Sequence, residues 1–151
     1  MVKIKLYQVD AFSDQLFSGN PAAVCPLEKW LPDEIMQAIA MENNLAETAF
    51  VNLDIDPYEL RWFTPKTEVD LCGHATLATA KVLFDRYLNK ERTEISFNSR
   101  SGILKANKKD EKIFLDFPRD HPSAIKNFDF LNYEIFIKPG AVCRGRAGYG
   151  A

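Results

Sequence analysis

One short segment of this sequence combines side chains that could move protons or hold an anion. It is Cys72-Gly73-His74, with the acids Glu68 and Asp70 just upstream and an apolar, helix-like run after it. Unpaired N–H groups and the helix dipole make a helix start an anion site suited to a carboxylate. His74 could donate a proton or a hydrogen bond to such a group, and Gly73 would allow close backbone approach. Cys72 beside the helix start could have a lowered pKa. The alternative is structural: Cys72 as a small core residue and His74 as a polar residue at a helix end.

A second candidate is Glu47, the only charged residue in the apolar run 45–51. The run alternates like a strand, with Glu47, Ala49 and Val51 on one side. If that side faces inward, desolvation favours the protonated carboxyl, and such a group can both take and return a proton. The alternative is an outward-facing glutamate at a strand start, solvated like most acids.

A third candidate is the turn Ser18-Gly19-Asn20-Pro21. Its side chains and backbone N–H groups could hold a polar ligand, although the same residues also make an ordinary turn.

The familiar cofactor and metal motifs are absent. The sequence has no glycine-rich nucleotide loop, no nucleophile elbow and no H-E-x-x-H pair. His121 lies far along the chain from His74, and Cys25 and Cys143 make no ligand spacing with Cys72. We therefore expect neither a cofactor nor a metal site.

The elements that must position these residues follow from periodicity and turn signals. The apolar helix spans 73–88, and its first internal charge is Lys81. A helix that is apolar all round is usually buried on all sides, which suggests a central helix wrapped by a sheet. A second helix is predicted from Pro32-Asp33-Glu34 to Asn43-Asn44. Strands are predicted at 3–12, 47–51, 60–64, 94–99, 102–107 and 112–117.

Composition sets outer limits on function. The 151 residues are 46% hydrophobic and 26% charged, which suits one domain with a substantial core. A net charge of -2 shows no basic excess, so we expect no nucleic-acid partner. No apolar run approaches the ~18 residues of a membrane span. With three cysteines and no export signal, we expect reduced thiols in a cytoplasmic protein.

Several segments together resemble the PhzF (phenazine biosynthesis) family. The resemblance covers residues 1–118, in order and with family-like spacing. It rests on VDAF at 9–12, FSGNPAAVC at 17–25, MQAIAMENNLAETAFV at 36–51, LRWFTP at 60–65 and EVDLCGHATLATA at 68–80.

The resemblance implies an α+β fold like that of diaminopimelate epimerase. In that fold, two similar halves each wrap a mostly antiparallel, barrel-like sheet around a central buried helix. It also implies a cofactor-free isomerase that moves a proton between carbons of a small carboxylated metabolite. By analogy Glu47 is the acid/base, Gly73 and His74 contact substrate, and Asn20 lines the cleft. Cys72 stands where related epimerases carry a catalytic thiol, and it is the second choice after Glu47.

The sequence departs from the family pattern after residue 118. Family members carry a second half with an aspartate and a serine in a motif resembling GDPVTGSAH, and nothing like it occurs here. Four of the seven glycines fall in the last twelve residues. We therefore expect an N-terminal family domain at 1–118 and a linker or irregular tail at 119–151.

Two functions follow from this departure. The chain is either the N-terminal half of a PhzF-type isomerase or a catalytically inactive, truncated domain that binds a small carboxylate or self-associates. The surface that a second half would cover should be apolar, and exposed apolar patches drive association. We therefore expect a homodimer or further self-association of the isolated chain.

Overall fold

The computed structural model describes residues 3–15, 17–117, 123–124 and 143–144. The chain divides into two units, Met1–Phe117 and Pro118–Ala151. In the second unit, β9 (Ser123–Ala124) pairs antiparallel with β10 (Cys143–Arg144). The sequence pattern predicted no strand there, and the rest of the expected tail at 119–151 lies outside the described residues.

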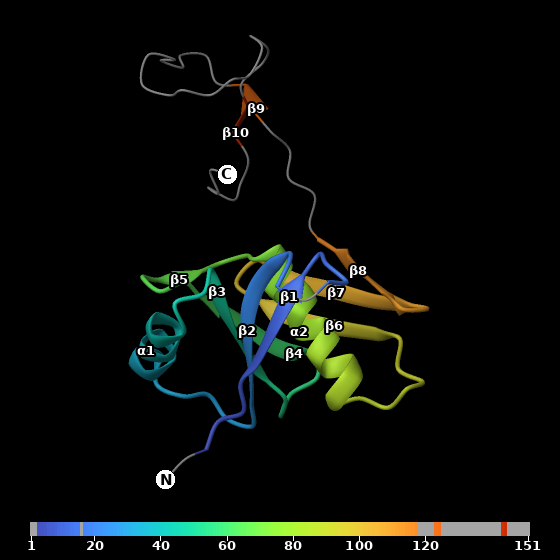
Figure 1. Cartoon of the computed structure of the whole chain (residues 1–151), viewed down its shortest axis with the longest axis horizontal. Helices are drawn as coiled ribbons and strands as arrows, with labels where there is room; N and C mark the ends of the chain where they lie inside the picture. Colours follow the sequence, from blue (N-terminus) through green and yellow to red (C-terminus); the bar gives the residue numbers. More distant parts are fainter. Residues whose placement is uncertain (1–2, 16, 118–122, 125–142, 145–151) are drawn as a thin grey trace. The chain divides into compact units, whose positions relative to one another are not determined.

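The first unit is built on one mixed sheet that curls around a helix (Figure 1). Its strand order is β1-β2-β3-β4-β6-β7-β8, with β5 paired to β4. The bounds are β1 Tyr7–Ala11, β2 Asn20–Leu27, β3 Glu47–Asn52, β4 Tyr58–Phe63, β5 Glu68–Val69, β6 Glu94–Ser99, β7 Gly102–Lys109 and β8 Lys112–Asp116.

Two strand pairs of this sheet are parallel, and a helix connects each of them. Strands β2 and β3 are joined through α1 (Asp33–Asn43), and β4 and β6 through β5 and α2 (Gly73–Arg86). Parallel neighbours need such a crossover, whereas the remaining pairs are antiparallel. The predicted α+β architecture, with a mostly antiparallel sheet around a central helix, is confirmed.

The two helices cover opposite faces of β2, β3 and β4. Side chains alternate across a strand, so neighbouring residues pack against different helices. One core surrounds α2, and a second, smaller core lies beneath α1. The α2 side includes Ala22, Val24, Ala49, Val51, Leu60 and Trp62, and the α1 side includes Cys25, Leu27, Phe50 and Phe63.

Helix α2 is the central helix that the sequence predicted. Eight of its residues are buried, two of them threonines. The exception is a narrow stripe carrying Lys81 and Asp85, whose charged groups pair at 2.8 Å. The helix ends at Arg86, two residues before the predicted end at 88. In this part of the chain neither helix has the length and apolarity needed to cross a bilayer.

Helix α1 begins and ends where its sequence signals place it. Pro32 stands at the N-cap with φ -52°, and Asn44 at the C-cap is left-handed with φ 50°. The N–H of Asn44 donates to the carbonyl oxygen of Ala40 at 3.2 Å, which closes the last turn. The chain then enters β3, and therefore the end of α1 sets where Glu47 stands.

Candidate active site

Strand β3 holds Glu47 in the interior. All six of its residues are buried, because α2 lies on one face and α1 on the other. Glu47 shares the face of Ala49 and Val51, which points toward α2. Only 7% of Glu47 is exposed, so the solvated alternative does not apply.

The start of α2 places the other two side chains of the cluster. Cys72 has extended backbone angles, φ -146° and ψ 116°, and His74 follows in the first helical turn. The carbonyl oxygen of Cys72 accepts bonds from the Thr76 N–H at 3.2 Å and the Thr76 hydroxyl at 2.5 Å. Thr76 is fully buried and therefore ties this turn to the core. No functional signal in the sequence could have identified Thr76, since a threonine inside a helix has many uses.

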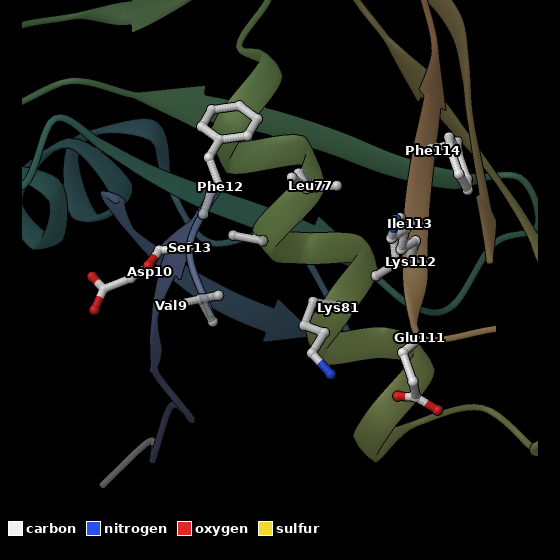
Figure 2. Close-up of a pocket in the computed structure, with 12 residues that line it drawn as sticks. Val9, Asp10, Phe12, Ser13, Leu77, Lys81, Glu111, Lys112, Ile113 and Phe114 are labelled. Atoms are coloured by element: carbon white, nitrogen blue, oxygen red, sulfur yellow. The ribbon is translucent and has the colours of Figure 1, made fainter. Parts of the chain in front are cut away.

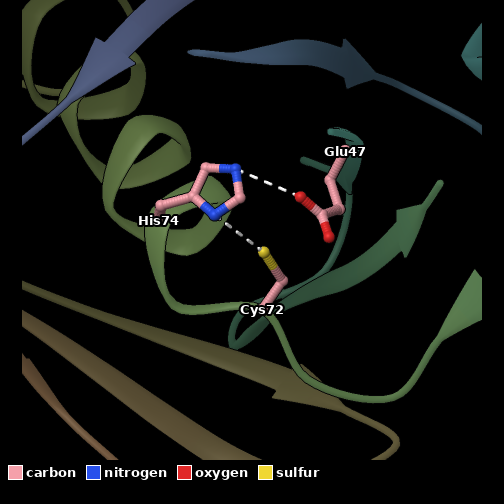
Figure 3. A group of neighbouring side chains, drawn as sticks. All are labelled: Glu47, Cys72 and His74. Atoms are coloured by element: carbon pink, nitrogen blue, oxygen red, sulfur yellow. Dashed lines mark hydrogen bonds and ion pairs between the residues drawn. The ribbon is translucent and has the colours of Figure 1, made fainter. Parts of the chain in front are cut away.

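Glu47, Cys72 and His74 form one buried cluster (Figure 3). Nε2 of His74 lies 3.1 Å from Oε2 of Glu47, and Nδ1 lies 3.4 Å from Sγ of Cys72. The imidazole thus stands between the carboxylate and the sulfur (Figure 3). Glu47 and His74 are 27 positions apart in the sequence, and the packing of β3 against the start of α2 brings them together.

The carboxylate and the imidazole are close but not aligned for a hydrogen bond. Oε2 of Glu47 and Nε2 of His74 are both buried and have no hydrogen-bond partner among the described residues. A buried polar atom without a partner costs free energy, and native proteins keep few of them. Such atoms are therefore available to a ligand that enters the cluster.

The thiol of Cys72 behaves differently from the sequence expectation. The pKa of Cys72 is raised to about 12, chiefly by burial; a backbone hydrogen bond from Ala75 opposes this increase, and the charge of Glu47 adds to it. The prediction of a lowered pKa at the helix start is wrong, because loss of solvation outweighs the helix terminus. A protonated thiol that donates to Nδ1 of His74 leaves the imidazole proton on Nε2, the nitrogen that faces Glu47.

The remaining candidates lie near the cluster or are engaged elsewhere. Asn20 is the first residue of β2, two residues before Ala22, whose Cα is paired with that of Glu47. It therefore stands at the same end of the sheet as the cluster. Gly73 opens α2 without a positive φ, and a Cβ there would meet only Phe117, at 3.6 Å. Packing within the protein therefore does not require a glycine at position 73, and the predicted close approach of a ligand to this backbone stays a prediction.

The two acids upstream of Cys72 take part in ion pairs outside the cluster. Glu68 accepts from Arg61 at 2.7 Å and from Arg100 at 2.6 Å. Asp70 lies 3.7 Å from Arg100. These acids stabilise the segment leading into α2 and are not brought to Glu47.

Sequence reasoning missed one property of the cluster. A carboxylate, a thiol and an imidazole, all metal-ligating groups, lie with one atom each within 4.8 Å of one another. Linear spacing could not show this, because Glu47 comes from a different element than Cys72 and His74.

A family model described as phenazine biosynthesis-like protein matches residues 9–138. The chain belongs to this family. The family match continues past residue 118, where the sequence resemblance ended.

Relatives and solved structures agree with this membership. An uncharacterized isomerase of Pseudomonas aeruginosa is 52% identical over 138 residues, covering 91% of this chain and 52% of the relative. A PhzF-family phenazine biosynthesis protein of Enterococcus faecalis, known from its crystal structure, is 54% identical with a TM-score of 0.75, over 83% of this chain and 48% of that one. A predicted epimerase of P. aeruginosa, 24% identical with a TM-score of 0.70 over 83% of this chain and 46% of that one, has the same fold. The chain spans about half the length of the curated relatives it matches.

Proposed function

We propose that this chain is the N-terminal half of a cofactor-independent isomerase or epimerase of PhzF type. The proposed reaction moves a proton between carbons of a small carboxylated metabolite. The observation that carries the proposal is the buried contact of 3.1 Å between Glu47 and His74 at the start of α2. Family membership and relatives named isomerases support the class of reaction.

In the proposed mechanism Glu47 is the acid/base. Its carboxylate takes a proton from an activated carbon of the substrate and returns it to another carbon on the same face. The position of Glu47 in a mostly dry cluster keeps water from competing for that proton. A positioned acid/base contributes roughly 10²–10⁴-fold to a reaction rate.

The start of α2 would stabilise the negative charge that develops on the substrate. The N–H groups of its first turn and the imidazole of His74 are donors already held in place by the helix. Gly73 and Asn20 would contact the substrate carboxylate and line the cleft. Cys72 acts on the position of the His74 ring rather than as a base, since burial raises the pKa of its thiol to about 12.

Proton exchange with solvent tests the proposal. The chain, and a chimera that joins residues 1–117 to the second half of the E. faecalis relative, are incubated in D₂O with a panel of small unsaturated or amino carboxylates. Deuterium on a substrate carbon, read by mass spectrometry, is the expected result for the chimera. We expect little exchange by the chain alone, because the chain spans about half the length of its relatives and the family resemblance implies that a second half completes the site.

The Glu47→Gln variant of the chimera keeps the size of the side chain and removes the base. We expect deuterium incorporation to fall by about 10²–10⁴-fold. An Asp85→Asn variant on the exposed stripe of α2 is the control and should exchange at the parent rate. Exchange that survives in a folded Glu47→Gln chimera would show that another group moves the proton.

A second candidate function is a non-catalytic domain that self-associates or binds a small carboxylate. It is favoured by a groove of about 380 Å³ between β1 and β8, over α2 (Figure 2). Phe12 and Phe114 line this groove and are 72% and 52% exposed. None of the three cluster residues lines it, so association there would not need the catalytic groups. The cytoplasmic location expected from the sequence stays a prediction.

A further inference from the structure

We propose that a second cavity, at the end of the sheet remote from Glu47, binds a small aromatic acid. This distal pocket is lined by residues 3–5 and 26–31 together with Leu53 and Tyr87. Its volume is about 400 Å³, which is typical of small-molecule sites. None of the three residues of the buried cluster lines it.

The strands place the distal pocket far from the candidate active site. Leu27 is the last residue of β2, and Leu53 directly follows β3. Asn20 and Glu47 are the first residues of the same two strands, which run parallel. The six positions from Glu47 to Leu53 span roughly 20 Å of extended chain. The pocket is therefore a separate site, and its ligand does not depend on the proposed function.

The floor of the distal pocket is apolar and is held by both cores of the first unit. Trp30 and Leu31 pack against the core beneath α1, and Leu53 and Tyr87 pack against the core around α2. The N–H of Leu53 donates to the carbonyl oxygen of Leu27 at 2.8 Å, which ties the ends of β2 and β3 together. An apolar ring would thus enter a cavity that is already formed, so little ordering opposes its binding.

The rim of the distal pocket carries an excess of positive charge. Lys3, Lys5 and Lys29 line it together with a single acid, Glu28. Within the described residues, none of these lysines takes part in an ion pair. The whole chain has a net charge of -2, so the excess is local rather than a consequence of composition. A concave site lined by one sign of charge attracts an ion of the opposite sign, which here is an anion.

The groove over α2 has no such excess. It is lined by the acids Asp10 and Glu111 and by the lysines Lys81 and Lys112. Lys81 is moreover paired with Asp85 at 2.8 Å. The two cavities have similar volumes, about 380 and 400 Å³, so charge rather than size distinguishes them. Charge complementarity assigns the acid to the distal pocket.

Tyr87 connects the charged rim with the apolar floor. The Nζ atom of Lys5 lies 5.8 Å from the centre of the Tyr87 ring, which places an ammonium group at the aromatic wall. The hydroxyl of Tyr87 lies 3.2 Å from that of Tyr7. Two paired hydroxyls use only one of their two protons, so Tyr87 can donate to a carboxylate when Tyr7 donates to it. Burial and the Tyr7 hydroxyl raise the pKa of Tyr87 to about 12, so this proton is present at neutral pH.

Fluorine NMR tests the proposal, because the distal pocket contains its own reporter. Of the two tryptophans in the chain, Trp30 lines the pocket, whereas Trp62 is 1% exposed in the core around α2. Protein labelled with fluorotryptophan should give two resonances, which the Trp30→Phe variant assigns. Benzoate should shift the Trp30 resonance in a saturable manner. A shift confined to Trp62, or no shift of either resonance, would overturn the proposal.

Two further compounds separate the charge of the ligand from its apolar body. Benzamide keeps the ring of benzoate without the charge, and acetate keeps the charge without the ring. Each should bind at least about tenfold more weakly than benzoate, because a charged hydrogen bond or the apolar contact is lost. Sodium chloride should weaken the binding of benzoate and not that of benzamide. Equal affinities for benzoate and benzamide would show a purely apolar pocket and would overturn the anion site.

Lysine variants locate the acid group of the ligand. Lys5→Gln and Lys29→Gln should each weaken benzoate binding by about two- to fivefold, which is the effect of one exposed ion pair. Lys112→Gln makes the same substitution in the groove over α2 and should bind benzoate like the parent chain. All three side chains are exposed, so each variant should fold. Unchanged affinity in the Lys5→Gln, Lys29→Gln double variant, or weaker binding in Lys112→Gln, would place the acid elsewhere and overturn the proposal.

Discussion

The imidazole of His74 is the side chain that connects the other two members of the cluster. It stands 3.1 Å from Glu47 and 3.4 Å from Cys72, each through a different ring nitrogen. Because the thiol remains protonated at neutral pH, it can set which nitrogen carries the proton. The cluster thus brings together a carboxylate, an imidazole and a thiol from this chain, and their roles as base, donor and orienting group stay predictions.

The two buried thiols should make the free energy of unfolding fall as the pH becomes alkaline. Burial raises the pKa of both Cys25 and Cys72 from 9.0 to about 12, so the folded state holds these protons more tightly than the unfolded state. Their contribution is fully present below pH 9.0 and is lost as pH rises toward 12. Between these values each thiol should lower the free energy of unfolding by up to about 1.4 kcal/mol per pH unit.

Urea unfolding at a series of pH values measures this dependence. A Cys25→Ala variant removes one of the two buried thiols, so its stability should fall less steeply over the same range. The slope of unfolding free energy against pH is compared between the parent and the variant. This comparison removes the pH-independent cost of the substitution and the effect of the lysines and tyrosines that both proteins share. Equal slopes in the two proteins would mean that the buried thiol does not titrate as the structure implies.

At the scale of elements, the connection between β1 and β2 decides where Asn20 lies. Gly19 has φ +93°, and a Cβ there would collide with the backbone oxygen of Ala11. Glycine is therefore required twice, once for the left-handed conformation and once for space. This conformation lets Asn20 pair with Ala11 at the start of β2, and β2 lies alongside β3, the strand that carries Glu47.

Two glycine variants separate these two requirements. Gly102 has a similar φ of +94°, but a Cβ there would have no atom within 4 Å. Gly102→Ala should cost about 1–2 kcal/mol for the backbone conformation alone. Gly19→Ala should cost about 2–5 kcal/mol, because overpacking adds to the same strain. Chemical denaturation gives both values, and equal costs would remove the steric part of the explanation.

At the scale of the whole molecule, the first unit has a sheet with two edges beside one groove. Strands β1 and β8 each pair on one side within the described residues, and both line the groove over α2 (Figure 2). Unpaired strand edges and exposed aromatic residues are both liabilities for association. Since the relatives are about twice as long, we expect their additional half to cover part of this surface of the first unit.

Self-association should therefore depend on the groove. Light scattering after size-exclusion chromatography should give a mass that rises with the concentration of the parent chain. A Phe12→Lys, Phe114→Lys double variant should remain nearer the monomer mass, because charge replaces the exposed rings. Met41→Lys, which changes a 61% exposed residue on α1, is the control and should behave like the parent. A parent chain that is monomeric at every concentration would contradict the prediction.

Local patterns in the sequence predicted both helices and most strands of the first unit, although they predicted no strand at β2. Pro32 and Asn44 predicted the ends of α1, and the apolar circumference of 73–88 predicted a central helix, because caps and periodicity act over a few residues. Family motifs identified Glu47 and His74 as candidates, and their roles stay predictions. Only the tertiary structure decided that Glu47 faces α2, that Cys72 is too buried for a reactive thiolate, and that the upstream acids pair with arginines. The reason is physical: solvation and charge at a side chain depend on which distant elements pack against it, and no local pattern carries that information.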